Sequence, residues 1–180
     1  MKKRIESIAH IAICVALIII CSWIYIPLVV PITLQTFAIF SVLGFLGGKK
    51  GTLAVLCYVL IGALGFPVFS NFKGGIAIIL NDFSGGYIIG FIIVALIYWA
   101  AQAIFGQNPA VELIALAVGL VTCYLVGTLW YVWINARVSN TLEFFNVLSV
   151  CVTPFIAPDV AKLASSFVLV KKLRKHLKIT

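Results

Sequence analysis

The sequence predicts an all-α integral membrane protein whose six transmembrane helices form one bundle. Hydrophobic residues make up 63% of the 180 residues and charged residues only 10%, whereas charged residues are about 25% of soluble domains. Apolar runs long enough to cross a bilayer recur along the chain. The net charge of +8 comes from basic residues at the ends of these runs. That pattern indicates membrane topology and a lipid environment, and it argues against nucleic acid as a partner.

A spanning helix needs about 20 mostly apolar residues. The sequence offers six candidate segments, at 8–26, 32–47, 51–66, 84–105, 110–135 and 147–171. The first is expected to be a retained span, because no small-x-small cleavage site closes it. The second and third are short and are joined by a tight glycine- and lysine-rich turn. We expect one helical transmembrane domain over residues 1–180, without a soluble appendage or linker.

The distribution of basic residues predicts the orientation of the bundle. Six spans place both termini on one side, together with the Lys49-Lys50 turn and the basic segment 171–178. Only Lys73 and Arg137 fall on the opposite loops. The positive-inside rule therefore predicts cytoplasmic N and C termini.

The connection between the third and fourth spans, residues 67–83, is long and lies on the predicted outer side. It contains an apolar run, Ile76 to Leu80, that is too short to span a membrane. Long connections in compact domains are often lids or binding loops. We expect this segment to fold back over the helices and to gate a pocket that opens outward.

Asp159 and Lys162 lie inside the last apolar segment. A charge near the centre of a spanning helix costs roughly 2.5 to 3.5 kcal/mol on insertion scales. Residues three apart share a helix face. The two ions can therefore form a self-satisfied pair, with Asp159 capping a helix that restarts after Pro154 and Pro158, or they can present a donor and an acceptor to a ligand. Because intramembrane ions generally face a cavity or pathway, the sequence favours the ligand.

Other polar or amphipathic side chains are candidates for the same outward pocket. Trp and Tyr side chains would supply flat apolar walls with hydrogen-bonding tips. The alternative is an interfacial aromatic belt with ordinary helix packing. Together with Asp159 and Lys162, the candidates for substrate binding are Gln35, Asn81, Gly85, Gly86, Tyr87, Thr128 and Trp130.

Ala9, Ala12 and Ala16 give the first span a small-residue stripe that permits close helix approach. The neighbour can be another helix of this chain or a second subunit.

The five cysteines are isolated, and no histidine stands at metal-ligand spacing. The sequence also lacks a nucleophile elbow, a zinc-protease motif and a Ser/His/Asp set. We therefore expect that the protein is not an enzyme and that it needs no cofactor.

Ordered motifs throughout the chain carry a family resemblance. They are Pro31-Ile32-Thr33-Leu34-Gln35-Thr36, Gly62-Ala63-Leu64-Gly65-Phe66-Pro67-Val68-Phe69, Gly74-Gly75, Gly85-Gly86-Tyr87-Ile88-Ile89-Gly90-Phe91, Gly127-Thr128-Leu129-Trp130 and Pro158-Asp159-Val160-Ala161-Lys162. The set resembles the BioY family, the biotin-binding S components of energy-coupling-factor (ECF) transporters.

This resemblance implies a six-helix bundle in the bacterial cytoplasmic membrane that binds biotin in an outward-facing pocket. It also implies docking on a transmembrane T component that carries two cytoplasmic ATPases. The family's paired Asp and Lys fall on Asp159 and Lys162, and its fourth-helix motif falls on Gly85, Gly86 and Tyr87. The alanine stripe resembles the surface by which S components meet the T component.

We therefore expect the biotin-binding component of an ATP-driven vitamin uptake system. The alternatives are an S component for another small vitamin and a stand-alone secondary carrier. Carriers commonly show two related halves with interrupted helices in corresponding positions. The sequence shows no such repeat.

Overall fold

The structure is a computed structural model that describes residues 2–138, 147, 149 and 152–177. Five of its helices are long and apolar enough to cross a membrane, so the chain is a multi-pass membrane protein. The elements are α1 (Lys2–Trp23), β1 (Tyr25–Ile26), β2 (Ile32–Thr33), α2 (Gln35–Ala63), a 3₁₀ turn (Ser70–Phe72), α3 (Ile76–Asn81), α4 (Gly85–Phe105), α5 (Pro109–Val138) and α7 (Thr153–Leu177).

Helix α2 is a helical hairpin with two antiparallel limbs. Its backbone reverses at Gly47, where φ is +76°, a conformation that glycine adopts without steric cost. The limbs then pack so closely that a Cβ at Gly51 would lie 2.9 Å from the Leu43 Cα. The side chain of Gln35 also reaches Tyr58, 23 residues away. These limbs are the predicted spans 32–47 and 51–66, and the predicted all-α, six-helix bundle is confirmed.

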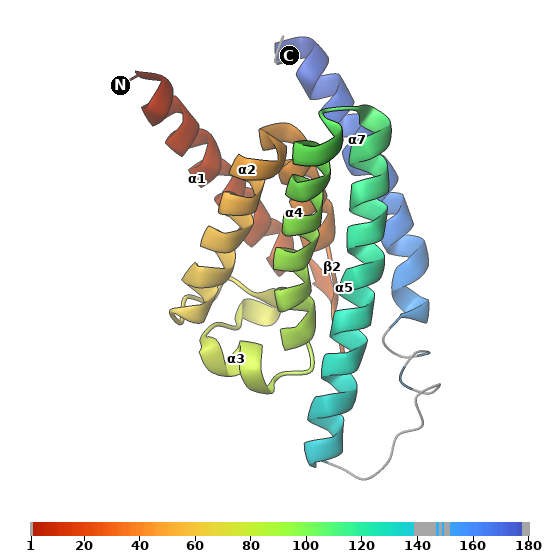
Figure 1. Cartoon of the computed structure of the whole chain (residues 1–180). Coiled ribbons are helices and arrows are strands. Elements are labelled where there is room, and N and C mark those ends of the chain that lie inside the picture. Colours follow the sequence, from red (N-terminus) through yellow and green to blue (C-terminus); the bar gives the residue numbers. More distant parts are fainter. Residues whose placement is uncertain (1, 139–146, 148, 150–151, 178–180) are drawn as a thin grey trace.

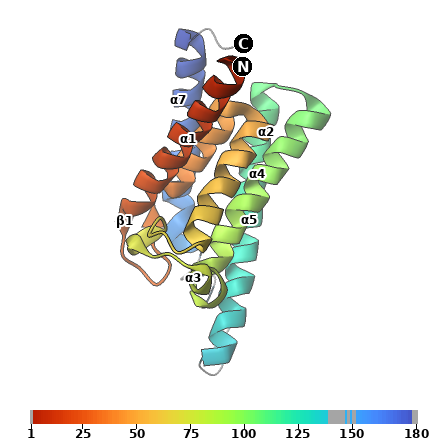
Figure 2. The ribbon, with the colours of Figure 1, turned by 90° about the vertical axis from the view of Figure 1, so that its left-hand side faces the viewer.

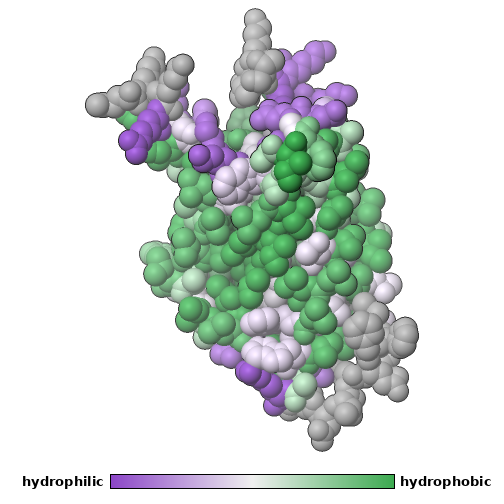
Figure 3. Space-filling model, in the orientation of Figure 1, coloured by the Kyte–Doolittle hydropathy of each residue, from purple (hydrophilic) through white to green (hydrophobic). Residues whose placement is uncertain are grey.

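Both described ends of the chain lie at one end of the bundle, together with the α2 turn and the α4–α5 connection (Figures 1 and 2). We call this the terminal end and the opposite one the loop end. Hydrophilic side chains gather at the two ends, and an apolar band lies between them (Figure 3). The predicted last span, 147–171, is seen as α7 from Thr153 onward. Positions 148, 150 and 151 lie outside the described residues.

A buried polar junction holds four helices together at the terminal end. Arg174 of α7 donates to both carboxylate oxygens of Glu112 in α5, at 3.0 and 3.1 Å, and also to the Gly44 carbonyl of α2. Gln102 of α4 donates to Glu112 at 3.1 Å and accepts from the Gly48 amide at 2.6 Å. Glu112 is almost fully buried, so the junction neutralises a carboxylate that would otherwise be costly at this depth.

At the loop end, the connection between α2 and α4 folds back on the bundle, and α3 packs against α2 and α4. Lys73 forms an ion pair with Asp82 at 2.5 Å. The Ser84 amide and hydroxyl donate to the same carboxylate at 2.9 and 2.7 Å. Burial raises the pKa of Asp82, but the hydrogen bonds and the Lys73 charge outweigh it, so this pKa lies below its ordinary value.

Helices α4 and α5 approach each other across glycines. A Cβ at Gly86 would lie 2.2 Å from the Trp130 Cβ, and one at Gly127 would lie 2.5 Å from the Tyr87 ring. No real Cβ tolerates these distances, so the two helices can keep this spacing only because both positions lack a side chain.

We expect Gly86→Ala to destabilise the bundle by about 1–3 kcal/mol, because the added methyl group forces α4 and α5 apart. Thermal unfolding of the purified protein in a mild detergent measures the effect. Ala100→Val, which adds bulk at an exposed position of the same helix, is the control and should leave the melting temperature unchanged. Equal melting of Gly86→Ala and wild type would show that the close approach has no energetic consequence.

Asp82→Asn is expected to loosen the loop-end connection, because it removes the ion pair with Lys73. Since the folded pKa of Asp82 is lowered, the carboxylate stabilises the fold above its unfolded pKa. That contribution is lost as the pH falls through the folded pKa. Hydrogen exchange of amides 70–82 should therefore be faster in the variant at neutral pH and should converge with wild type in acid. A difference that persists unchanged in acid contradicts this explanation.

Candidate functional site

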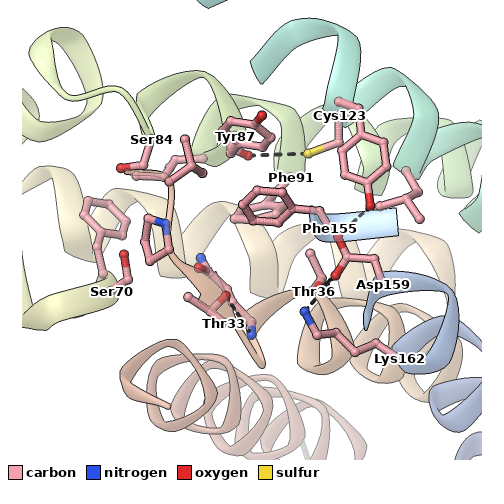
Figure 4. Close-up of a pocket in the computed structure, with 17 residues that line it drawn as sticks. Thr33, Thr36, Ser70, Ser84, Tyr87, Phe91, Cys123, Phe155, Asp159 and Lys162 are labelled. Atoms are coloured by element: carbon pink, nitrogen blue, oxygen red, sulfur yellow. Dashed lines mark hydrogen bonds and ion pairs between the residues drawn. The ribbon is translucent and has the colours of Figure 1, made fainter. Parts of the chain in front are cut away.

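A cavity of about 50 Å³ lies inside the bundle, where α2, α4, α5 and α7 meet the segment that leads into α2 (Figure 4). Its lining combines apolar walls with a small polar cluster on one side. The lining residues are Val30, Pro31, Thr33, Gln35, Thr36, Phe69, Ser70, Ser84, Tyr87, Ile88, Phe91, Leu120, Cys123, Tyr124, Phe155, Asp159 and Lys162.

Asp159 is the centre of the polar cluster. Its Oδ1 accepts from the Lys162 ammonium group at 2.7 Å and from the Thr36 hydroxyl at 3.0 Å. Its Oδ2 accepts from the Tyr124 hydroxyl at 2.8 Å. The residue is only 2% exposed, so these three donors replace the water that would solvate the carboxylate. They come from α2, α5 and α7, and the carboxylate therefore ties three helices together.

Lys162 lies beside the carboxylate with its side chain 10% exposed. Within the described residues, its recorded hydrogen-bond partner is Asp159. An ammonium group carries three donors, so Lys162 retains donors that a cavity ligand can use. The pair combines an acceptor and a donor within one wall, as the spacing of the two residues predicts.

The Asp159–Lys162 pair lies in the wall of a cavity and not on a closed helix interface. Helix α7 runs without interruption from Thr153 through Pro158. Asp159 therefore does not cap a restarted helix, so that part of the alternative is wrong. The ion pair itself exists, but the Asp159 carboxylate accepts hydrogen bonds from Thr36 and Tyr124 as well as from Lys162.

Aromatic rings form the apolar walls of the cavity. Tyr87 of α4 and Phe155 of α7 stack with ring centroids 6.2 Å apart and planes inclined by 21°. Phe69 and Phe91 add further apolar surface, and both are buried. Aromatic rings beside a polar cluster suit a ligand with an apolar body and a hydrogen-bonding edge.

Gln35 links the cavity wall to the core of the α2 hairpin. It is 5% exposed, and its amide donates to the Tyr58 hydroxyl at 2.8 Å. Tyr58 in turn donates to the Val68 carbonyl, which also accepts from Ser22. This hydrogen-bond chain fixes the loop-end connection against α1 and both limbs of α2, and so holds Gln35 in position.

Four of the nine candidates for substrate binding line the cavity: Asp159, Lys162, Tyr87 and Gln35. The other five lie outside its lining. Gly85 and Gly86 pack against the connection and against Trp130, whose indole N–H donates to the Asp82 carbonyl at 3.2 Å. Asn81 is exposed at the end of α3. Thr128 is buried, and no hydrogen bond of its hydroxyl to another described residue is recorded.

The sequence reasoning missed Tyr124 and the phenylalanine walls. Tyr124 lies in the middle of α5, far from the ends where an interfacial belt places tyrosines. A tyrosine in the middle of a spanning helix needs a hydrogen-bond partner inside the bundle, so this position could have identified Tyr124 from the sequence. The phenylalanines gave no signal, since apolar rings are common in every span. Glu112 was also passed over, although an ionisable residue within an apolar span predicts a partner.

The alanine stripe of α1 is on the surface. Ala9, Ala12 and Ala16 are all exposed, so the structure does not pair them with another helix among the described residues. Small side chains on an exposed helix face are the kind that permit close helix approach in a membrane.

Comparison with known proteins identifies the family. The model of the BioY family matches residues 1–179. A biotin transporter BioY of Thermotoga maritima is 38% identical over 161 residues, which are 89% of this chain and 90% of that protein. A probable biotin transporter BioY of Pyrococcus horikoshii is 38% identical over 145 residues, 81% of each chain.

A solved structure agrees with these matches. The crystal structure of the S component for biotin from an ECF-type ABC transporter superposes with a TM-score of 0.83 at 28% identity. The superposition covers 97% of this chain and 93% of that one. The fold, the ordered motifs and the sequence relatives agree, and the chain belongs to the BioY family.

Proposed function

We propose that this chain is the S component of an ECF-type uptake system and that it binds biotin in the cavity beside Asp159 and Lys162. The observation that supports the proposal most strongly is the position of this buried ion pair in an aromatic-walled cavity. Ions at membrane depth are rare and mark ligand or ion sites, and the relatives of this chain are named as biotin transporters.

Biotin has the chemistry that such a cavity can recognise. Its ureido ring offers two N–H donors and a carbonyl acceptor, its bicycle is apolar, and its tail ends in a carboxylate. Asp159 can accept from the ureido N–H groups, and Lys162 can donate to an oxygen of the ligand. The rings of Tyr87 and Phe155 would cover the apolar bicycle.

The cavity must widen to admit this ligand. Its volume of about 50 Å³ is well below the roughly 300 Å³ or more that small-molecule sites span. Val30 and Thr33 before α2 and Ser70 and Ser84 of the loop-end connection line the cavity. Movement of these loop-end segments would enlarge it without disturbing the junction around Glu112.

In the proposed orientation, the terminal end faces the cytoplasm of a bacterial cell. Most basic clusters lie there, as the positive-inside rule requires of a cytoplasmic end. The loop end would then face outward and receive biotin. The exposed alanine stripe of α1 would contact the T component, whose two ATPase subunits would supply the energy for inward release.

We expect Asp159→Asn and Lys162→Ala each to weaken biotin binding by about 2 kcal/mol or more, roughly thirtyfold, because either change leaves the other charge unpaired. Equilibrium binding to the purified protein measures the effect. Ser165→Ala, at an exposed position of the same helix, is the control.

A neutral double variant, Asp159→Asn with Lys162→Gln, separates binding from stability. It removes both charges together, so the fold should recover most of the thermal stability lost by the single variants. Biotin binding should remain weak, because the ligand loses both partners. Wild-type affinity in the double variant would show that the pair is purely structural and would refute the proposed site.

Ala16→Leu is expected to reduce co-purification of the T component while leaving biotin binding intact, because the larger side chain fills the stripe where the partner helix would approach. Leu17→Phe is the matched control, since the next residue points about 100° away around the helix. Equal losses of the partner in both variants would place the contact elsewhere on α1.

A further inference from the structure

A second cavity, of about 170 Å³, lies at the terminal end between α5 and α7. It is separate from the cavity beside Asp159, and it shares no lining residue with it. Pro109 and Glu112 of α5 form one side, and Phe167, Val170, Lys171 and Arg174 of α7 form the other. The two helices touch only sparsely, since α7 packs mainly against α2. A gap therefore remains where these helices reach the membrane surface.

The cavity has one apolar part and one cationic part. The wall toward the membrane interior consists of the apolar side chains of Phe167 and Val170, which are half-buried and buried. Lys171 is exposed, and Arg174 has its side chain 27% exposed. Both basic groups lie at the C-terminal end of a spanning helix, where a lipid headgroup meets the protein.

The charges of this cavity do not cancel. Glu112 accepts three hydrogen bonds from Arg174 and one from Gln102, so its carboxylate is fully engaged. Within the described residues, Lys171 has no recorded ion pair. The remaining positive charge faces a hollow whose other wall is apolar, and basic pockets between transmembrane helices bind anionic lipid headgroups.

We propose that this cavity binds one anionic phospholipid, with the phosphate at Lys171, beside the Arg174–Glu112 pair, and an acyl chain along Phe167 and Val170. The lipid would fill the gap between α5 and α7 and add to the Arg174–Glu112 junction that holds these helices together at the terminal end. A free phosphate shares the headgroup chemistry but cannot use the apolar wall.

The test titrates a short-chain phosphatidylglycerol into the detergent-solubilised full chain and counts bound copies by native mass spectrometry. We expect one tight copy in wild type and about fivefold weaker binding in Lys171→Gln, the loss typical of one basic residue at a membrane surface. Lys172→Gln is the matched control. It removes the same charge one residue away, and Lys172 lines a different, open hollow with Ala164 and Ser165.

Three outcomes would overturn the proposal. Equal weakening in Lys171→Gln and Lys172→Gln would mean that lipid responds to the general charge of the terminal end and not to this cavity. Equal binding of phosphatidylcholine would remove the anionic selectivity. Equally tight binding of inorganic phosphate would identify a free-anion site. Biotin binding should be unchanged in both lysine variants, because neither residue lines the cavity beside Asp159.

Discussion

The fold depends on one constraint, which is that every charged group buried in the bundle must find its partners there. Water is absent there, so an unpartnered buried ion costs several kcal/mol. This chain satisfies the constraint with two polar centres on α7, one around Asp159 and one around Arg174. Each centre draws donors or acceptors from several helices. The polar groups therefore decide which helices meet, while the apolar residues fill the space between them.

The two centres differ in what surrounds them. The junction of Arg174, Glu112 and Gln102 is satisfied by side chains and backbone groups of four helices. Both centres border a cavity, but the cluster around Asp159 lies next to the stacked rings of Tyr87 and Phe155, and its ammonium group has donors left over. The first arrangement suits a fixed scaffold. The second leaves donors directed toward space that a ligand can occupy.

Close helix contacts set the spacing between these centres. Gly86 and Gly127 let α4 and α5 meet almost backbone to backbone, and Gly47 reverses the chain so that α2 supplies two limbs. The α2 turn also brings Gly44 and Gly48 to the junction at the terminal end. Glycines thus contribute to the site indirectly, by positioning the helices that carry Gln35, Tyr87 and Tyr124.

The sequence by itself determined the membrane class, the helical segments and the presence of two opposite charges, Asp159 and Lys162, inside the last segment, because hydrophobicity and isolated charges in apolar runs are local properties. Only the tertiary structure decided which side chains join that pair. Tyr124 lies 35 residues and Thr36 lies 123 residues from Asp159 along the chain, and no local pattern encodes such distances. Trp130 and Gly86 were expected to line the cavity, but they pack beside it, and no local pattern could have shown this. Their place depends on how α4 and α5 rotate against each other.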